Sequence, residues 1–285
     1  MNLFESLTLE ALKNQEKLAS LRIVVEKELL HHDILRIMAG KGFLSDLTFI
    51  GGTCLRDCYG SPRLSEDLDF TGGRNFNRAL LHELGPTLVA ALGDKYSLPV
   101  IVSEPQREEG NVDTWKIRLV TRPERPDLSA QKINIDICAI HSHKRQPTTI
   151  RNNYDVDMGT FGLIVQAESL EEILADKYIA LAMRPNRVKQ RDIWDLYWLD
   201  LQGIAIDLSL LKVKLEDRHI EIADFKTALS GRMEGLASGY SEFKKEIVRF
   251  LPLTITRGLD QNGYWEALTD GLKYQSTLIL GGLPA

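Results

Sequence analysis

The chain has 285 residues, of which 44% are hydrophobic and 26% are charged, and this is the average composition of globular proteins that bury a core. The composition excludes a chain that is disordered throughout. The formal net charge of -5 at pH 7 argues against general coating of nucleic acid by a basic surface, so any RNA contact must come from a local basic patch.

Three features of the sequence bear on its compartment. The first residues lack a basic segment and soon carry Glu5 and Glu10, which argues against a secretory signal. No apolar run approaches the ~18 residues that a membrane-spanning helix needs. The cysteines Cys54, Cys58 and Cys138 are few and odd in number, which suits a reducing compartment. We therefore expect a cytoplasmic protein that makes no membrane contact.

Residues 1–40 are predicted to be helical, because apolar residues recur at three- and four-residue steps with charges between them. The positions in this pattern are Leu18, Leu21, Val24, Val25, Leu29, Leu35 and Met38. Gly40 and Gly42 then predict a stop. The apolar run 47–50 predicts a buried strand that ends at two glycines, followed by a short helix to residue 59.

The next hundred residues alternate between strand and helix patterns. Strands are predicted at 68–70, 99–103, 114–121 and 132–140, where residues alternate in polarity or are β-branched, and a helix is predicted at 75–92. A short apolar run at 163–165 closes this half. From 169 to about 273 nearly everything reads as helix, and the predicted breaks are Pro185, Gly203, Gly231 and Pro252. The fold class is therefore α/β (α+β), with a mixed-sheet domain at 1–165 and a helical domain at 166–285.

The segment with the clearest chemistry begins at Gly51, Gly52 and Thr53, between the strand at 47–50 and the helix after it. Glycines at such a position let backbone N–H groups approach a phosphate, and a helix N-terminus adds the positive end of a dipole. A Gly-Gly turn is by itself more often structural than functional. We predict a phosphate cradle here because a pair of aspartates comes soon after the turn in the sequence.

Asp67 and Asp69 form this pair, in the stretch Arg63-Leu64-Ser65-Glu66-Asp67-Leu68-Asp69-Phe70. Residues two apart on a strand point to the same face, so the two carboxylates would project together. They repel unless a cation lies between them. Oxygen ligands suit Mg²⁺ or Mn²⁺, and a pair of such ions assists in-line displacement at phosphorus. We predict that Asp67 and Asp69 bind the metal ion.

These motifs resemble the AbiEii/AbiGii-type nucleotidyltransferase toxins of the DNA polymerase β-like superfamily. The resemblance rests on Gly-Gly-Thr-x-Leu from Gly51, on Arg-x-Ser-x-Asp-x-Asp-Phe from Arg63, and on two later elements, at 175–181 and 191–196. It covers roughly residues 45–200. The usual superfamily pattern has Gly-Ser before the Asp-x-Asp pair, and Gly-Gly-Thr is the variant of the toxin family.

The resemblance also implies roles for single residues. It implies that the Gly51–Thr53 turn, Arg63 and Ser65 bind the nucleotide, that Lys177 meets its phosphates, and that Asp192 is the acidic partner of Lys177. Asp195 is assigned less firmly, because it could simply pair with Arg191 one helical turn earlier. A lysine is a compact point charge suited to a triphosphate, and Arg184 lies on the same helix face, seven residues on.

Polymerase-like sites usually carry a third carboxylate on a neighbouring strand, and Asp136 is the candidate. It lies on the polar face of a strand whose other face carries Ile133, Ile135 and Ile137. A carboxylate in such an apolar strand is costly unless it is paired or binds a metal. We predict that Asp136 binds the metal and deprotonates the attacking hydroxyl. Spacing alone leaves open whether Asp136 or Asp192 is the general base.

The function implied is Mg²⁺-dependent transfer of a nucleotide from an NTP to an RNA acceptor with release of pyrophosphate. The resemblance implies the tRNA 3′ end as acceptor and a cognate antitoxin as partner. Arg184, Arg187 and Lys189 are the candidate RNA-binding residues, although a run of cations is often only a solvated face. The alternatives are transfer to a small molecule, as in aminoglycoside nucleotidyltransferases, and an inactive nucleotide- or RNA-binding regulator.

Two further patterns are interpreted as structural. Cys54 and Cys58 lie four apart on a predicted helix, but no Cys/His pair lies near them in register, so core packing is expected rather than zinc binding. His141 and His143 follow the strand of Asp136 and are expected in a loop.

Overall fold

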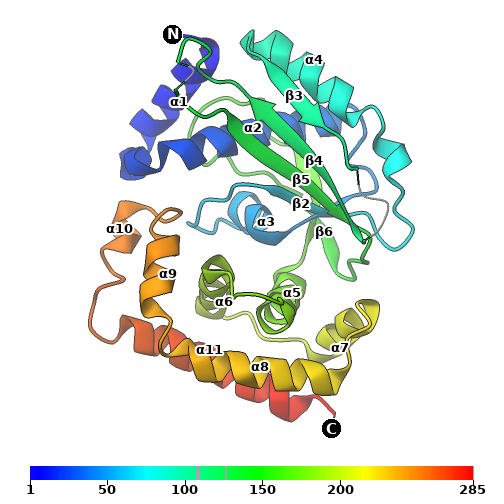
Figure 1. Cartoon of the computed structure of the whole chain (residues 1–285), viewed down its shortest axis with the longest axis vertical. Helices are drawn as coiled ribbons and strands as arrows, with labels where there is room; N and C mark the ends of the chain where they lie inside the picture. The colour runs from blue at the N-terminus through cyan, green and yellow to red at the C-terminus, as the bar shows by residue number, and fades with distance from the viewer. Residues whose placement is uncertain (107–109, 126, 285) are drawn as a thin grey trace. The chain divides into compact units, whose positions relative to one another are not determined.

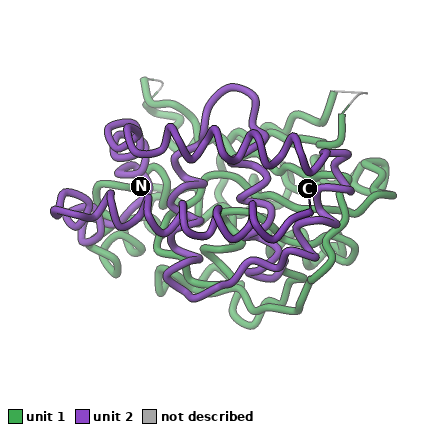
Figure 2. Tube along the Cα trace, turned by 90° about the horizontal axis from the view of Figure 1, so that it is seen from below, with its two compact units in different colours: residues 1–167 green, residues 168–285 purple. Residues whose placement is uncertain are grey.

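The computed structural model describes residues 1–106, 110–125 and 127–284. The chain divides into two compact units, 1–167 and 168–285, which Figure 2 shows in separate colours. The first unit contains a mixed β-sheet with helices, and the second is helical (Figure 1). The predicted fold class is confirmed.

The first forty residues are helical, as the apolar periodicity predicts. They form α1 (Leu3–Asn14), the 3-10 helix η1 (Glu16–Leu21) and α2 (Arg22–Gly40). α2 ends at Gly40, and Gly42 has φ +77°, a left-handed conformation that glycine adopts at little cost. The two glycines therefore stop the helix where the sequence indicates.

Seven strands of the described residues form one mixed sheet in the order β3-β4-β5-β2-β1-β7-β6. They are β1 (Thr48–Ile50), β2 (Leu68–Thr71), β3 (Val100–Ser103), β4 (Val112–Leu119), β5 (Gln131–Cys138), β6 (Arg145–Thr149) and β7 (Ile164–Glu168). β2 runs parallel to β5, and β1 runs parallel to β7. The pairs β1–β2, β3–β4 and β4–β5 are antiparallel.

The two faces of the sheet differ in polarity. Ile133, Ile135 and Ile137 of β5 and Trp115 and Ile117 of β4 are buried. On this side α2 contacts β5, and α4 (Leu84–Tyr96) contacts β3. The residues between them in the sequence lie on the opposite face and are exposed or half-buried. The alternation predicted for Asp136 is therefore present, and it places the polar residues of the central strands on one surface.

Two elements of the first unit differ from the sequence prediction. Instead of one helix at 75–92, the chain forms the 3-10 helix η2 (Arg78–Leu81) and then α4. Pro86 lies in the first turn of α4, where a missing N–H is tolerated, but its ring prevents a helix from passing through. The strand β6 has no counterpart in the sequence prediction. It lies at the edge of the sheet, where a proline such as Pro147 is tolerated.

The second unit consists of helices. They are α5 (Leu170–Met183), α6 (Gln190–Leu201), α7 (Leu208–Asp217), α8 (Ile222–Leu236), α9 (Tyr240–Ile247), α10 (Leu253–Thr256) and α11 (Tyr264–Gly282). α5 packs against α6, α7 and α8. Pro185, Gly203 and Pro252 lie between helices, but Gly231 lies inside α8. The break predicted at Gly231 is wrong, because one glycine costs a helix only about 1 kcal/mol.

The second unit contains an ionic cluster around the buried Lys214. The Lys214 ammonium lies 2.8 Å from Glu168, 2.6 Å from Glu172 and 2.9 Å from Asp176. These carboxylates hold the pKa of Lys214 above its usual value although burial lowers it. The cluster ties α5 to α7. Among the described residues, no helix combines the length and the apolar character that crossing a bilayer requires.

Candidate active site

The turn between β1 and α3 (Gly51–Asp57) requires glycine at two successive positions. Gly51 has φ +75°, and a Cβ there would lie 2.8 Å from Oδ2 of Asp69. A Cβ on Gly52 would collide with the guanidinium of Arg63 and lie 3.4 Å from the Ser65 hydroxyl. The bare backbone of the turn therefore lies directly against three of the predicted site residues.

The predicted carboxylates lie on or next to two adjacent strands of the sheet, β2 and β5. The β2–β5 register pairs Asp69 with Asp136, so these side chains lie side by side on adjacent strands. Asp67 comes one residue before β2, and its Oδ1 accepts a hydrogen bond from the Asn134 backbone N–H at 3.0 Å. Oδ1 of Asp136 accepts one from the Thr114 hydroxyl at 2.6 Å. All three carboxylates remain partly exposed.

The buried helix α2 holds the loop that leads into β2. Glu28 accepts a hydrogen bond from the Ser65 backbone N–H at 2.8 Å. A ring nitrogen of His31 lies 3.0 Å from the Glu66 carbonyl oxygen, and Lys27 pairs with the Glu66 carboxylate at 2.8 Å. Sequence reasoning missed these supports. The only signal was a set of charged residues within an apolar helix, and no spacing links α2 to the loop.

Several predicted nucleotide-binding residues are themselves buried. Arg63 is 3% exposed and Ser65 is 6% exposed. Arg63 Nη1 donates to the Leu64 carbonyl oxygen at 2.9 Å, which orients the guanidinium. The Thr53 hydroxyl donates to the Asp67 carbonyl oxygen, so this side chain fixes the backbone next to the paired aspartates. A contact between Thr53 and a phosphate would therefore use its backbone N–H.

The carboxylates fit a divalent cation by the chemistry of their donors. Asp67, Asp69 and Asp136 offer only oxygen, which Mg²⁺ and Mn²⁺ prefer. Within the described residues, no three His, Cys, Asp or Glu side chains are arranged as a closed metal-binding group. Mg²⁺ is usually held by one or two carboxylates together with substrate phosphates rather than by a protein cage. The donor set therefore fits an ion that arrives with a nucleotide.

The second unit brings the other predicted residues together. The Lys177 ammonium lies 2.7 Å from Asp192 Oδ1 and 2.6 Å from Asp195 Oδ2. Arg184 Nη2 lies 3.0 Å from the second oxygen of Asp192. Burial raises the pKa of the Asp192 carboxyl, but Lys177 and two further cations outweigh burial and hold the pKa below its usual value.

Asp195 is fully buried and pairs with Lys177. Arg191, its candidate partner from the sequence, pairs with Glu246 of α9 at 3.6 Å. In the basic run, Arg187 and Lys189 are exposed. Arg184 is tied into the unit, because its carbonyl oxygen accepts a hydrogen bond from Arg232 and its guanidinium holds Asp192.

The two patterns interpreted as structural lie in the interior and in a loop. Cys54 and Cys58 are buried and form no disulfide, which agrees with core packing. His141 and His143 lie in the loop after β5, as expected, with ring centroids 4.8 Å apart.

A mixed sheet that carries three carboxylates beside a Gly-Gly turn is typical of nucleotidyltransferases. The comparison with protein families agrees. Residues 33–269 match the family described as the nucleotidyl transferase AbiEii toxin of type IV toxin–antitoxin systems. The chain therefore belongs to the AbiEii family and is a nucleotidyltransferase toxin. A search of curated proteins returned no significant match.

Solved structures are similar to the chain over nearly its whole length. MenT4, a nucleotidyltransferase toxin from Mycobacterium tuberculosis H37Rv, has a TM-score of 0.54 and 12% identity, with 95% of this chain and 98% of that chain covered. JHP933 from Helicobacter pylori has a TM-score of 0.47 and 18% identity, with 91% and 93% covered. A candidate nucleotidyltransferase from H. pylori has a TM-score of 0.48 and 17% identity, with 91% and 96% covered. At these identities the likeness to MenT4 concerns the fold alone.

Proposed function

We propose that the enzyme transfers a nucleotide from an NTP to an RNA acceptor, the 3′ end of tRNA, with the help of Mg²⁺ or Mn²⁺. The observation that carries the proposal is the β2–β5 register, which sets Asp69 beside Asp136 on the sheet face next to the Gly51–Gly52 turn. Membership in the AbiEii family implies an NTP substrate and an antitoxin partner. Growth arrest follows from a blocked tRNA end, and the protein acts in the cytoplasm.

We assign a separate role to each group of site residues. Asp67 and Asp69 would hold the metal ion, which would supply positive charge to the phosphates during in-line displacement. The backbone at 51–53, with Arg63 and Ser65 against it, receives the triphosphate. In the second unit, Lys177, which is paired with Asp192 and Asp195, is the lysine that we assign to the phosphates.

Asp136 accepts the proton of the acceptor hydroxyl. The hydroxyl oxygen then forms a bond to the α-phosphorus, the bond from this phosphorus to the bridging oxygen breaks, and pyrophosphate leaves. The hydrogen bond from Thr114 fixes one oxygen of Asp136 and orients the carboxylate for this step. We assign the general base to Asp136 rather than Asp192, because two cations lie within 3.0 Å of Asp192 and stabilise its charge.

The experiment is a transfer assay with each radiolabelled NTP and purified tRNA, with and without EDTA. We expect labelled tRNA with one preferred NTP, no label after the metal is removed, and recovery when Mg²⁺ is restored. A parallel reaction with kanamycin in place of tRNA tests the small-molecule acceptor. Label on kanamycin but not on tRNA would overturn the RNA proposal.

A further inference from the structure

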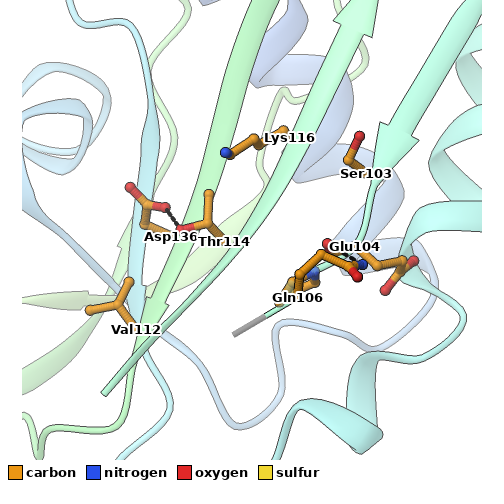
Figure 3. Close-up of a pocket in the computed structure, with 8 residues that line it drawn as sticks. Ser103, Glu104, Gln106, Val112, Thr114, Lys116 and Asp136 are labelled. Carbon is orange, nitrogen blue, oxygen red and sulfur yellow. Dashed lines mark hydrogen bonds between the residues drawn. The ribbon is translucent and has the colours of Figure 1, made fainter. Parts of the chain in front are cut away.

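A pocket of about 490 Å³ opens beside Asp136 in the first unit (Figure 3). Its described lining comes from β4, β5, the end of β3 and the residues after β3: Ser103, Glu104, Pro105, Gln106, Val112, Thr114, Lys116 and Asp136. The volume lies within the range of about 300–1,000 Å³ found for sites that hold small ligands. It has room for one nucleotide and not for a folded RNA element.

The strand register places this pocket on the same face as the motif carboxylates. Thr114 of β4 is paired with Asp136 of β5, which is paired with Asp69 of β2. Two residues after Thr114 on β4, Lys116 is paired with Ser103 of β3. Paired residues share a sheet face, so the polar row leads without interruption from the paired aspartates to the pocket. Asp136 belongs to both.

The polar groups of the lining indicate how an acceptor could bind. The Glu104 carboxylate accepts a hydrogen bond from the Trp115 indole N–H at 3.1 Å and also lies against Gly85 of α4. The other charged groups of the described lining are Lys116 and Asp136, beside hydroxyl and amide groups. Both carboxylates accept hydrogen bonds, Glu104 from Trp115 and Asp136 from Thr114. Lys116 offers a point charge to a phosphate, and the hydroxyl and amide groups near it can hydrogen-bond the attached nucleoside.

We propose that this pocket binds the terminal nucleotide of the acceptor RNA, with its ribose hydroxyl at Asp136 and its phosphate at Lys116. The inference rests on the proposed RNA acceptor and adds where its last residue binds. Thr114 orients Asp136 from the pocket wall, and Ser103 and Gln106 offer hydrogen bonds to the nucleoside.

Two substitutions that each remove one positive charge test the phosphate contact. Lys116→Gln removes the pocket cation, and Arg118→Gln removes an equal charge two residues on, on the same exposed face of β4 and outside the pocket lining. With NTP saturating, we expect Lys116→Gln to raise the KM for tRNA about tenfold and to leave the KM for NTP unchanged. Arg118→Gln should leave both within about twofold.

Two substitutions that each introduce a tryptophan test whether the acceptor occupies the volume of the pocket. Ser103 and Ile101 are exposed and lie on the same face of β3, but only Ser103 lines the pocket. Ser103→Trp should fill the pocket and lower kcat/KM for tRNA at least tenfold, with an unchanged melting temperature. Ile101→Trp adds the same bulk outside the pocket and should have no effect on transfer.

Binding of a labelled 3′-terminal oligoribonucleotide, followed by fluorescence anisotropy without NTP, separates this inference from the transfer reaction. Weaker binding by Lys116→Gln and Ser103→Trp, but not by their controls, supports the pocket even if the wild-type enzyme transfers nothing to tRNA. If all four variants bind and react alike, or if the pocket variants lose NTP affinity instead, the acceptor pocket is wrong.

Discussion

The carboxylates of the first unit are held by hydrogen bonds that a carboxamide can also accept. Asp67 Oδ1 takes the Asn134 backbone N–H, and Asp136 Oδ1 takes the Thr114 hydroxyl. Replacement of either aspartate by asparagine therefore removes charge while retaining an acceptor oxygen in the same place. The role of the charge can be tested without breaking the contacts that position the strands.

Asp67→Asn and Asp69→Asn are each expected to lower transfer at least a hundredfold, because each removes an anionic ligand from the metal ion. The apo protein should melt at the same temperature or slightly higher, since removal of one of two crowded carboxylates relieves repulsion. Asp94→Asn, on the exposed surface of α4, is the control. Near-normal transfer by either site variant would contradict the metal-binding role.

Lys177 requires a different substitution, because it neutralises two buried carboxylates. Its removal would leave Asp192 and Asp195 short of a partner, at a cost of about 3–5 kcal/mol in stability. A loss of activity in Lys177→Ala would therefore say nothing about phosphate binding.

Lys177→Arg retains the charge and is expected to keep the melting temperature within a few degrees. The planar guanidinium of arginine does not reproduce the compact ammonium of lysine. We therefore expect transfer to fall about tenfold or more, with a raised KM for NTP. Thermal denaturation and NTP-dependent kinetics of the same preparation test this. Full activity of Lys177→Arg, together with a melting temperature like that of the wild type, would favour a purely structural ion pair.

At the scale of elements, the turn from β1 into α3 combines backbone strain with a close contact. Gly42 and Gly51 have nearly the same positive φ, +77° and +75°. A Cβ on Gly51 would meet Asp69, whereas a Cβ on Gly42 would have nothing within 4 Å. Alanine substitutions at the two positions therefore distinguish the effect of placing a side chain at positive φ from the effect of displacing the Asp69 carboxylate.

Alanine at either glycine should cost about 1–2 kcal/mol in the free energy of unfolding. Only Gly51→Ala should also abolish transfer, because it displaces Asp69 from its position beside Asp136. Urea denaturation and the transfer assay on both variants provide the measurement. Equal activity of the two variants would show that the turn does not position the catalytic carboxylate.

The elements also show what the sequence can and cannot predict. The run at 47–50, the strand at 68–70 and the alternating Ile133, Ile135 and Ile137 were predictable, because burial on one face leaves a periodic pattern. β6 was not, because an exposed edge strand that contains Pro147 has no such pattern. The uninterrupted α8 was missed because the packing of neighbouring helices outweighs the low helix propensity of Gly231.

The same limit applies to the site. Gly51, Asp67, Asp69 and Asp136 could be selected from local spacing, and the structure brings them together in the first unit. The support from Glu28 could not be found, since its partner Ser65 lies 37 residues away and only tertiary folding joins them. The pocket beside Asp136 likewise depends on the register of three strands.

At the scale of the whole molecule, the net charge of -5 opposes association with RNA, so contacts must be concentrated locally. The basic run after α5 is the densest group of cations, but Arg184 is held by Asp192. Arg187 and Lys189 are the exposed members. A test of RNA binding should therefore change these two and leave Arg184 in place.

Arg187→Gln/Lys189→Gln takes the net charge from -5 to -7, and so does the control Lys245→Gln/Arg257→Gln, which removes two exposed cations elsewhere in the second unit. Removal of a phosphate contact should flatten the dependence of log K on log salt by about 0.7 on a single strand. We expect the first double variant to bind tRNA more weakly and with a flatter slope, while NTP affinity stays unchanged. The control shares the change in net charge, so it should shift affinity slightly and retain the slope. If the two double variants give parallel lines in a salt titration of tRNA binding, the basic run does not contact RNA, and net charge alone accounts for the weakening.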